Sequence, residues 1–242
     1  MKLMDLKSIS QLQHEMLYNP AALQQILYDL SINVTEMFRD PSFYQTLRKE
    51  VVPLLKTYPF IKIWHAGCST GEEVYSMAIL LKEEGLYDRS QIYATDFNQK
   101  VLKTAKSGIY SIEHIRDYTQ NYQKAGGRES FSAYYDADYN SVIMDSSLRK
   151  NVVFADHNLV TDGVFAEMHL IICRNVLIYF DRQLQDRVIH LFLSSLAPGG
   201  VLCLGNKENI QFSSWANHFS VISPNEKIFK KLYSSPDSMQ NG

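Results

Sequence analysis

The sequence predicts an α/β fold built on a doubly wound, mostly parallel sheet, and three observations lead to that prediction. Apolar, strand-like runs alternate with helical patterns along residues 61–204, as strands and their crossover helices do. The run 168–173 is almost wholly apolar, as expected of a central parallel strand that is buried on both faces. Two β-rich runs at 219–222 and 227–233, separated by Ser-Pro-Asn-Glu, predict a closing antiparallel pair.

Caps, breakers and periodicity place the individual elements. Asp40 and Pro41 predict the N-cap and first turn of a helix over 42–55. Gly108 predicts the end of a helix over 99–106, and the Ala-Pro-Gly-Gly run 197–200 predicts the end of a helix over 182–196. The other predicted elements are helices at 74–81 and 112–123 and strands at 61–66, 91–96, 151–156, 168–173 and 201–204.

A chain of 242 residues can bury the core of one full α/β domain. Residues 1–31 predict two short helices, too few for a core of their own, so we expect a helical leader followed by a main domain over 32–242. A break at 125–128 and a Tyr-rich alternating run at 131–144 predict a small antiparallel β-subdomain inserted at about 127–150. Such a hairpin either offers a surface to a partner or covers the core.

A glycine-containing turn after the first strand is the first candidate binding feature. Gly67 and Gly71 permit backbone angles closed to other residues, and such a turn presents N–H groups above the strand. A phosphate site would add a third glycine or a Gly-Lys-Ser/Thr ending, whereas this chain has Glu72 and Glu73. Negative charge there suits an ammonium or sulfonium group, and S-adenosylmethionine carries both. Taken alone, the turn is as well explained by a purely structural role.

Polar residues follow the ends of three predicted strands. Asp96 closes the second strand at the interval where Rossmann-type sites place a carboxylate on the ribose hydroxyls. It could also cap the helix over 99–106, although Asn98 can cap while Asp96 faces a ligand. Asn158 follows the third strand, and Arg174 and Asn175 follow the fourth. Ligands of doubly wound sheets lie at the carboxyl ends of the strands, so these residues predict a site there.

Bulk properties disfavour several classes of function. The net charge of −2 gives no basic field for nucleic acid. No apolar run approaches the length needed to insert in a membrane. Cys68, Cys173 and Cys203 lie in apolar strand contexts, which favours a reducing cytoplasm. The histidines are scattered without zinc-ligand spacing, so we expect no metal.

Five ordered motifs resemble those of the chemotaxis receptor glutamate methyltransferases, the CheR-type proteins. The resemblance covers residues 31–232. It implies a Rossmann-like methyltransferase fold and transfer of a methyl group from S-adenosylmethionine to glutamates on the cytoplasmic helical bundle of a chemoreceptor, with S-adenosylhomocysteine as product. The motifs are Asn-Val-Thr-Glu-Met-Phe-Arg-Asp at 33–40, Gly-Cys-Ser-Thr-Gly-Glu-Glu at 67–73 with Tyr75 and Ser76, Ala-Thr-Asp at 94–96, Asn-Leu at 158–159, and Cys-Arg-Asn-Val-Leu-Ile-Tyr-Phe at 173–180.

The resemblance also implies roles for residues that match its motifs. Two of them, Arg39 and Tyr179, match catalytic residues beside the transferred methyl group, and Asp96 would hold the ribose. The residues expected at the methionine end of the cofactor are Asn33, Thr35, Arg39, Gly67 and one of the pair Glu72 and Glu73. The residues expected to border the adenosine and the reacting centre are Asn158, Leu159, Arg174 and Asn175.

The chemistry of such a reaction agrees with these roles. A glutamate carboxylate is ionised at neutral pH and is already the nucleophile, so no general base is needed. The rate must come from aligning the carboxylate with the S-methyl bond and from excluding water. Arg39 could orient the carboxylate, and Tyr179 could donate a hydrogen bond to its second oxygen. From the residues alone, Tyr179 is better explained as an aromatic packing on Phe180.

Two departures from the family keep other functions open. Family members usually carry a basic helical domain ahead of residues 33–40, of which this chain has the last few dozen residues. Some members dock a receptor-tail peptide on the β-subdomain, which the long acidic connection here makes less expected. A methyltransferase for a small carboxylate or for a non-chemotaxis signalling protein, and a non-catalytic cofactor-binding module, are the alternatives. Nitrogen acceptors are disfavoured because Arg-Asn-Val-Leu stands where N-methyltransferases of this fold have Asn/Asp-Pro-Pro-Tyr.

Overall fold

The computed structural model describes residues 8–19 and 35–233. The chain forms two compact units, residues 1–34 and 35–242. In the first unit, α1 (Ile9–Tyr18) is capped by Ser8, whose Oγ accepts a hydrogen bond from the Gln11 N–H at 3.2 Å. The second helix predicted for the leader lies outside the described residues.

A seven-stranded sheet organises the second unit, in the order β6-β2-β1-β7-β8-β10-β9. The first five strands of that order are parallel, and β10 pairs antiparallel with both β8 and β9. This confirms the predicted doubly wound sheet with its closing antiparallel pair. The strands are β1 (Ile61–Ala66), β2 (Ser90–Asp96), β6 (Val152–Asp156), β7 (Met168–Cys173), β8 (Leu196–Leu204), β9 (Phe219–Ser223) and β10 (Ile228–Lys231).

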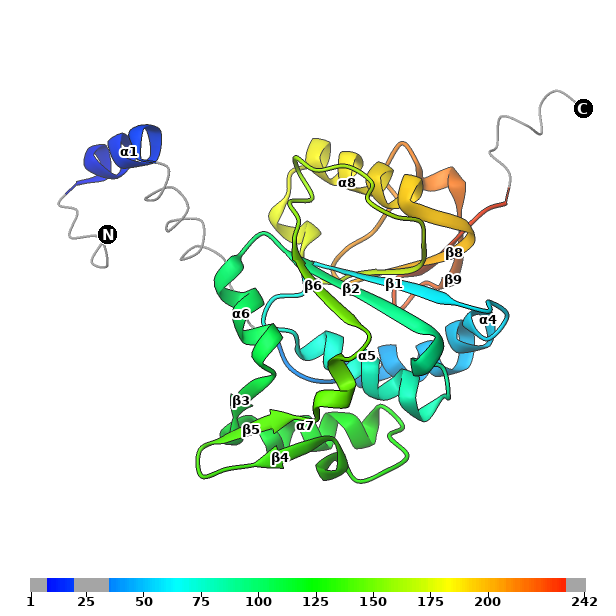
Figure 1. The fold of residues 1–242 in the computed structure, drawn as a ribbon. Helices are drawn as coiled ribbons and strands as arrows, with labels where there is room; N and C mark the ends of the chain where they lie inside the picture. The colour runs from blue at the N-terminus through cyan, green and yellow to red at the C-terminus, as the bar shows by residue number, and fades with distance from the viewer. Residues whose placement is uncertain (1–7, 20–34, 234–242) are drawn as a thin grey trace, which may run out of the picture. The chain divides into compact units, whose positions relative to one another are not determined.

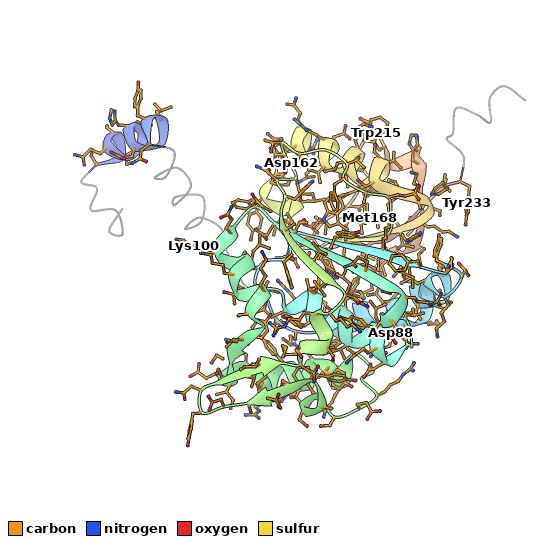
Figure 2. The ribbon with its side chains drawn as sticks, in the orientation of Figure 1. Asp88, Lys100, Asp162, Met168, Trp215 and Tyr233 are labelled. Carbon is orange, nitrogen blue, oxygen red and sulfur yellow. The ribbon has the colours of Figure 1, made fainter. Side chains whose placement is uncertain are left out.

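Helices cover both faces of the sheet (Figure 1). α8 (Arg182–Ser195) lies on one face, and α4 (Val52–Leu55) and α5 (Glu72–Glu83) lie on the other. Successive side chains of a strand point to opposite faces, and β1 accordingly places Ile63 in the core on the α5 side and Trp64 in the core on the α8 side. Figure 2 shows Met168, fully buried at the start of β7, between the sheet and α8.

A separate three-stranded antiparallel sheet, in the order β3-β5-β4, forms the predicted β-subdomain. It contains β4 (Tyr135–Ala137) and β5 (Ser141–Met144), which lie in the predicted insertion. Its third strand, β3 (Ile109–Ser111), follows α6 (Gln99–Ser107) and precedes α7 (Ile115–Lys124), where no strand was predicted. Three residues are too few to show a period, and β3 is defined by its pairing with β5, in which Ile109 faces Ile143.

One helix prediction and one strand prediction need correction, the helix over 42–55 and the strand over 201–204, which begins earlier as β8. The helix predicted over 42–55 is α3 (Pro41–Thr46), a π-helical turn over Leu47–Val51, and α4. Pro53 has no N–H to donate to the preceding turn, which accounts for the break in the α-helical pattern. The Ala-Pro-Gly-Gly run does follow the end of α8, but it forms a bulge inside β8, because Met168 pairs with Leu196 whereas Leu170 pairs with Val201.

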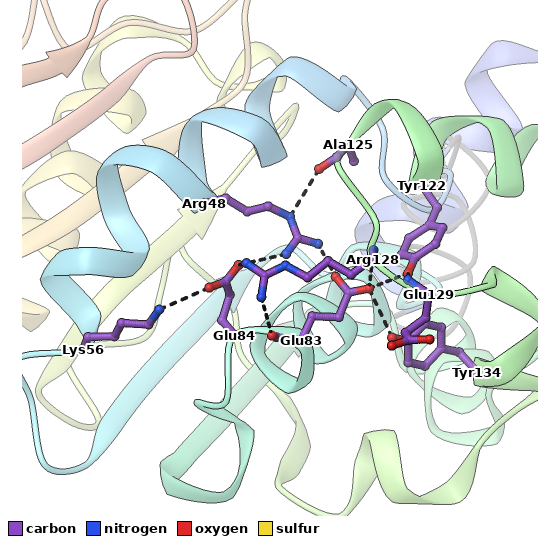
Figure 3. Close-up of polar contacts among 9 residues, drawn as sticks. All are labelled: Arg48, Lys56, Glu83, Glu84, Tyr122, Ala125, Arg128, Glu129 and Tyr134. Carbon is purple, nitrogen blue, oxygen red and sulfur yellow. Dashed lines mark hydrogen bonds and ion pairs between the residues drawn. The ribbon is translucent and has the colours of Figure 1, made fainter.

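A group of charged and phenolic side chains, which we call the α5 clamp, joins the carboxyl end of α5 to two other segments (Figure 3). Glu84 accepts from Arg48 at 3.0 Å and from Lys56 at 3.3 Å, and Arg48 also pairs with Glu83. Tyr122, Arg128 and Tyr134 contact the same two glutamates and hold the segment that leads into the β-subdomain against α5. The members of the clamp are Arg48, Lys56, Glu83, Glu84, Tyr122, Arg128 and Tyr134.

Candidate functional site

The turn between β1 and α5 is bent by residues with positive φ. Gly67 has a φ of 81° and Gly71 a φ of 94°, a region that favours glycine. A Cβ on Gly67 would lie 2.5 Å from a methyl carbon of Val176, so this glycine lets the loop after β7 approach the turn. The N–H groups of Gly67 and Cys68 both donate to the Thr95 carbonyl of β2 at 2.8 Å. The turn therefore does not present these N–H groups to a ligand as predicted.

Asp96, the last residue of β2, braces that turn. One carboxylate oxygen accepts from the Asn98 N–H and the other from the Ser69 N–H, both at 2.9 Å. Asn98 caps α6 by accepting from the Lys100 N–H at 2.9 Å. Of the two residues considered as the cap of this helix, Asn98 is therefore the one that caps it. Burial raises the pKa of Asp96. The Phe97 N–H also bonds to this carboxylate, which leaves about one of its four lone-pair sites for a ribose hydroxyl.

The two glutamates that begin α5 have different surroundings. Glu72 is 5% exposed and accepts from the Thr70 hydroxyl at 2.6 Å. Within the described ranges, no cationic side chain pairs with it, and burial raises its pKa to about 7. Glu73 lies 3.0 Å from His65 Nδ1 and 3.2 Å from Arg174. Burial opposes its ionisation, but these two partners outweigh burial and lower its pKa.

Arg174, just past the end of β7, is a buried cation that contacts several segments of the chain. Its guanidinium pairs with Asp40 and Glu73 and lies 4.1 Å from the centre of the Phe43 ring. Asp40 was predicted to cap a helix, but it makes no side-chain cap hydrogen bond because its carboxylate reaches Arg174. The guanidinium is thus held by protein partners, and a cofactor contact by Arg174 stays a prediction.

The segment that carries Arg39 is held in an uncommon conformation. Phe38 and Asp40, on either side of it, have φ values of 53° and 57°, which are costly for residues other than glycine. The Phe38 N–H donates to the Ser76 hydroxyl of α5 at 2.9 Å, and Arg174 donates to the Arg39 carbonyl at 3.4 Å. Strained backbone that is stabilised by neighbouring contacts is a common feature of functional sites.

Three further predicted residues have described positions, and one does not. Thr35 is half-buried, and Asn33 lies outside the described residues. Asn158 is exposed and accepts from the Val160 N–H at 3.0 Å within a local turn, whereas the neighbouring Leu159 is buried on the α8 side.

Asn175 and Tyr179 lie on one short turn after β7. Asn175 has a φ of 62°, and Tyr179 ends the 3₁₀ turn Leu177–Tyr179. The Tyr179 side chain is 56% exposed. That exposure argues against the interpretation of Tyr179 as a packing residue.

Glu208, after β8, is a buried carboxylate that the sequence analysis missed. It is 4% exposed and accepts from the N–H groups of Gly205, Asn175, Val176 and Leu177. Burial raises its pKa. Its neighbours Lys207 and Asn209 make the stretch resemble an exposed polar loop. The one available signal was its place in the loop that follows a predicted parallel strand, four residues after the end of that strand.

These contacts bring four chain segments together at the carboxyl ends of the strands. The glycine turn touches the end of β2 through Ser69 and Asp96 and the loop after β7 through Gly67 and Val176. The segment around Arg39 joins them through Arg174. The site residues with described positions on these segments therefore belong to one region, as the sequence predicted. Asn158 and Leu159 follow His157, whose N–H donates to the Asp96 carbonyl at 3.3 Å.

Among residues 8–19 and 35–233, no three His, Cys, Asp or Glu side chains are grouped so that they could hold a metal ion. Over the same residues, no helix has both the length and the apolar character needed to span a membrane.

Comparison with known proteins gives consistent results. Residues 33–228 match the family model described as "CheR methyltransferase, SAM binding domain". The chain is 55% identical over 227 residues to "Putative methyltransferase Cher3" of Pseudomonas putida, covering 94% of this chain and 83% of that protein. It is 32% identical over 190 residues to "Chemotaxis protein methyltransferase" of Listeria innocua, covering 78% and 70%. The solved structure of N-methyltransferase NodS from Bradyrhizobium japonicum aligns with a TM-score of 0.45 and 14% identity, covering 92% of this chain and 97% of that one.

Proposed function

The chain belongs to the CheR methyltransferase family and contains its S-adenosylmethionine-binding domain, and from this premise we propose that it methylates glutamate side chains. The substrate in this proposal is the cytoplasmic helical bundle of a chemoreceptor, and the reaction takes place in the cytoplasm. The match over residues 33–228 supports it most strongly, because that range includes all the described site residues.

The charges at the site fit the cofactor. S-adenosylmethionine carries a sulfonium and an ammonium group, and it supplies an activated methyl group when bound. Glu72 and Asp96 are buried carboxylates without a cationic side chain as partner within the described ranges. A buried carboxylate is costly unless it is paired, so a cationic ligand relieves that cost at Glu72. Asp96 retains acceptor capacity for ribose hydroxyls.

The residues beside the reacting centre act by orientation. The acceptor glutamate has an ordinary pKa of about 4.3 and is ionised at neutral pH, so no side chain has to remove a proton. Arg39 binds one oxygen of the incoming carboxylate. The hydrogen bond from Arg174 to the Arg39 carbonyl holds the backbone of Arg39 in place. The exposed phenol of Tyr179 donates to the other oxygen. Alignment of this kind can lower a barrier by about 7 kcal/mol or more.

A labelling experiment tests this function. The chain is incubated with methyl-labelled S-adenosylmethionine and a receptor cytoplasmic fragment, and volatile methanol is collected after mild base. Base-labile label on the fragment supports glutamate ester formation. Label that resists base identifies a different acceptor. The absence of transfer, with S-adenosylhomocysteine still bound in calorimetry, indicates a binding module and contradicts the proposal. Glutamate-to-alanine changes in the fragment provide the matched control.

A further inference from the structure

The short turn Asn175–Tyr179 has its backbone N–H groups held from one side by Glu208. Oε1 of Glu208 accepts from the N–H groups of Val176 at 2.8 Å and Leu177 at 2.7 Å. Oε2 accepts from the Asn175 N–H at 3.0 Å and from the Gly205 N–H. An ionised carboxylate has only acceptors, about four lone-pair sites on two oxygens, and here four donors meet them. A neutral amide could not accept from all four.

The same turn has its carbonyl groups held from the other side by α8. The side-chain amide of Gln185 donates to the Leu177 carbonyl at 3.0 Å and to the Phe180 carbonyl at 2.9 Å. Side chains from two separate elements therefore fix both the donors and the acceptors of one turn. Tyr179 lies on this turn, between the Leu177 and Phe180 carbonyls. The Val176 side chain of the same turn lies against Gly67 of the glycine turn.

The loop after β7 and the loop after β8 lie so close together at Gly205 that their backbones have little room to move. A Cβ on Gly205 would lie 2.8 Å from both the Asn175 nitrogen and the Glu208 carboxylate. Asn175 itself has a positive φ of 62°, a conformation that needs support from its surroundings. Glu208 supplies that support with a charge-assisted hydrogen bond to the Asn175 N–H.

We propose that Glu208 and Gln185 are positioning residues that hold the Asn175–Tyr179 turn against the glycine turn, in the geometry that methyl transfer requires. This role rests on the proposed function, in which Tyr179 contacts the acceptor carboxylate. Glu208 and Gln185 act through the backbone of the turn, since the carboxylate accepts from four N–H groups and the amide donates to two carbonyls.

The test uses the full chain with Glu208→Gln, read by two measurements. Amide hydrogen exchange over residues 175–177 should become faster, because an amide nitrogen replaces one acceptor oxygen. The kcat for methyl transfer should fall by about 10²-fold, the effect expected of a displacement of about 1 Å near the chemistry. The Kd for S-adenosylhomocysteine should rise by much less than kcat falls, about 10-fold at most, because Asp96 and Glu72 stay in place although Asn175 shifts.

A second variant covers the case in which Glu208→Gln does not fold. Gln185→Glu keeps the length of the side chain but removes the donor to both carbonyls, and a smaller fall in kcat of about 10-fold is expected.

Asp186, the residue after Gln185, provides the matched control. It accepts from the Ser213 hydroxyl and the Ser214 N–H, both at 2.7 Å. It therefore holds the loop after β8 at residues 213–214 and not at Glu208. Asp186→Asn should leave exchange at 175–177 and kcat unchanged.

The outcomes separate this role from the proposed function. If the wild-type chain transfers no methyl group, the proposed function fails, and faster exchange at 175–177 in Glu208→Gln with no such change in Asp186→Asn still supports the anchoring. If exchange at 175–177 is unchanged in Glu208→Gln, or if kcat falls equally in Asp186→Asn, the positioning role is overturned.

Discussion

The two ends of α5 carry the same residue pair in opposite surroundings. At its carboxyl end, Glu83 and Glu84 meet Arg48, Lys56 and Arg128. Burial opposes their ionisation, but hydrogen bonds and these cations outweigh it and lower both pKa values.

At the amino end, Glu72 has no cationic side chain among the described residues, and burial raises its pKa to about 7. A carboxylate is favoured at the amino end of a helix and disfavoured at the carboxyl end by the helix dipole. The raised pKa of Glu72 beside the lowered pKa values of Glu83 and Glu84 is the reverse of that expectation, so cationic partners and burial decide these values. Glu73, next to Glu72 but paired with Arg174, has a lowered pKa for the same reason. The protein pairs the acids at the carboxyl end of α5 with cations and leaves Glu72, a residue of the proposed cofactor site, without one among the described residues.

The largest effect is expected from the α5 clamp. Arg48→Met removes a cation whose side chain is 12% exposed and leaves Glu83 and Glu84, 2% and 5% exposed, with fewer partners. Breaking a buried pair in this way costs about 3 kcal/mol or more of unfolding free energy, measurable by urea denaturation. Affinity for S-adenosylhomocysteine should stay within about 3-fold, because the clamp lies at the far end of the helix. A stability loss below about 1 kcal/mol would show that the clamp is a surface network.

The next largest effect is expected at Asp96. Asp96→Ala should weaken S-adenosylhomocysteine binding by at least about 10²-fold, or about 3 kcal/mol, because it removes the proposed ribose acceptor and the carboxylate that holds the glycine turn. Calorimetry measures this directly. Asp145 is a matched control, since it also accepts from a backbone N–H, that of Ser147 at 2.7 Å, away from the site. Undiminished affinity in Asp96→Ala would refute the ribose assignment.

Glu72 links stability to pH with a definite sign. Its pKa is raised from 4.5 to about 7 in the folded chain, so the folded state binds more protons than the unfolded state between those values. Stability from this group is therefore lost as pH rises from about 4.5 to about 7 and stays constant above that range. Glu72→Gln should raise the unfolding free energy at pH 8 by about 1–3 kcal/mol. If denaturation at pH 5 and pH 8 shows no such difference between variant and wild type, Glu72 is not an unpaired acid.

The smallest effect is expected at the edge of the clamp. Lys56 lies 3.3 Å from Glu84, but half of its side chain is exposed. Exposed pairs contribute about 0–1 kcal/mol, so Lys56→Met should change the unfolding free energy by less than about 1 kcal/mol. A loss of unfolding free energy as large as that of Arg48→Met would mean that the number of ion pairs, and not their burial, determines how much the clamp stabilises the fold.

The sequence predicted the parts of the fold that depend on local pattern. The strand at 168–173 is present as β7 because an apolar run of that length is typical of a buried parallel strand. Asn98 and Gly108 mark the ends of α6. β3 was missed because its three residues become a strand only by pairing with β5.

The site was predictable as a location and less so as a set of contacts. Asp96 and Gly67 could be proposed as site residues because strand ends and glycine turns leave local signals. The partners of Arg174 were not, because Asp40 lies 134 residues away in the chain. Glu208 was missed because only tertiary structure buries it. Local spacing therefore indicates a candidate region for ligand binding, while the ion pairs within that region become known only from the folded structure.

The most direct test of the unpaired acid is the proton balance of cofactor binding. A cationic group placed beside Glu72 favours its ionised form, so binding at pH 7 should release a proton from a carboxyl group that is about half protonated in the free protein. Calorimetry of S-adenosylmethionine binding in two buffers of different ionisation enthalpy measures that release. The release should be larger in wild type than in Glu72→Gln, by roughly half a proton. Equal proton release from the two proteins would contradict the account.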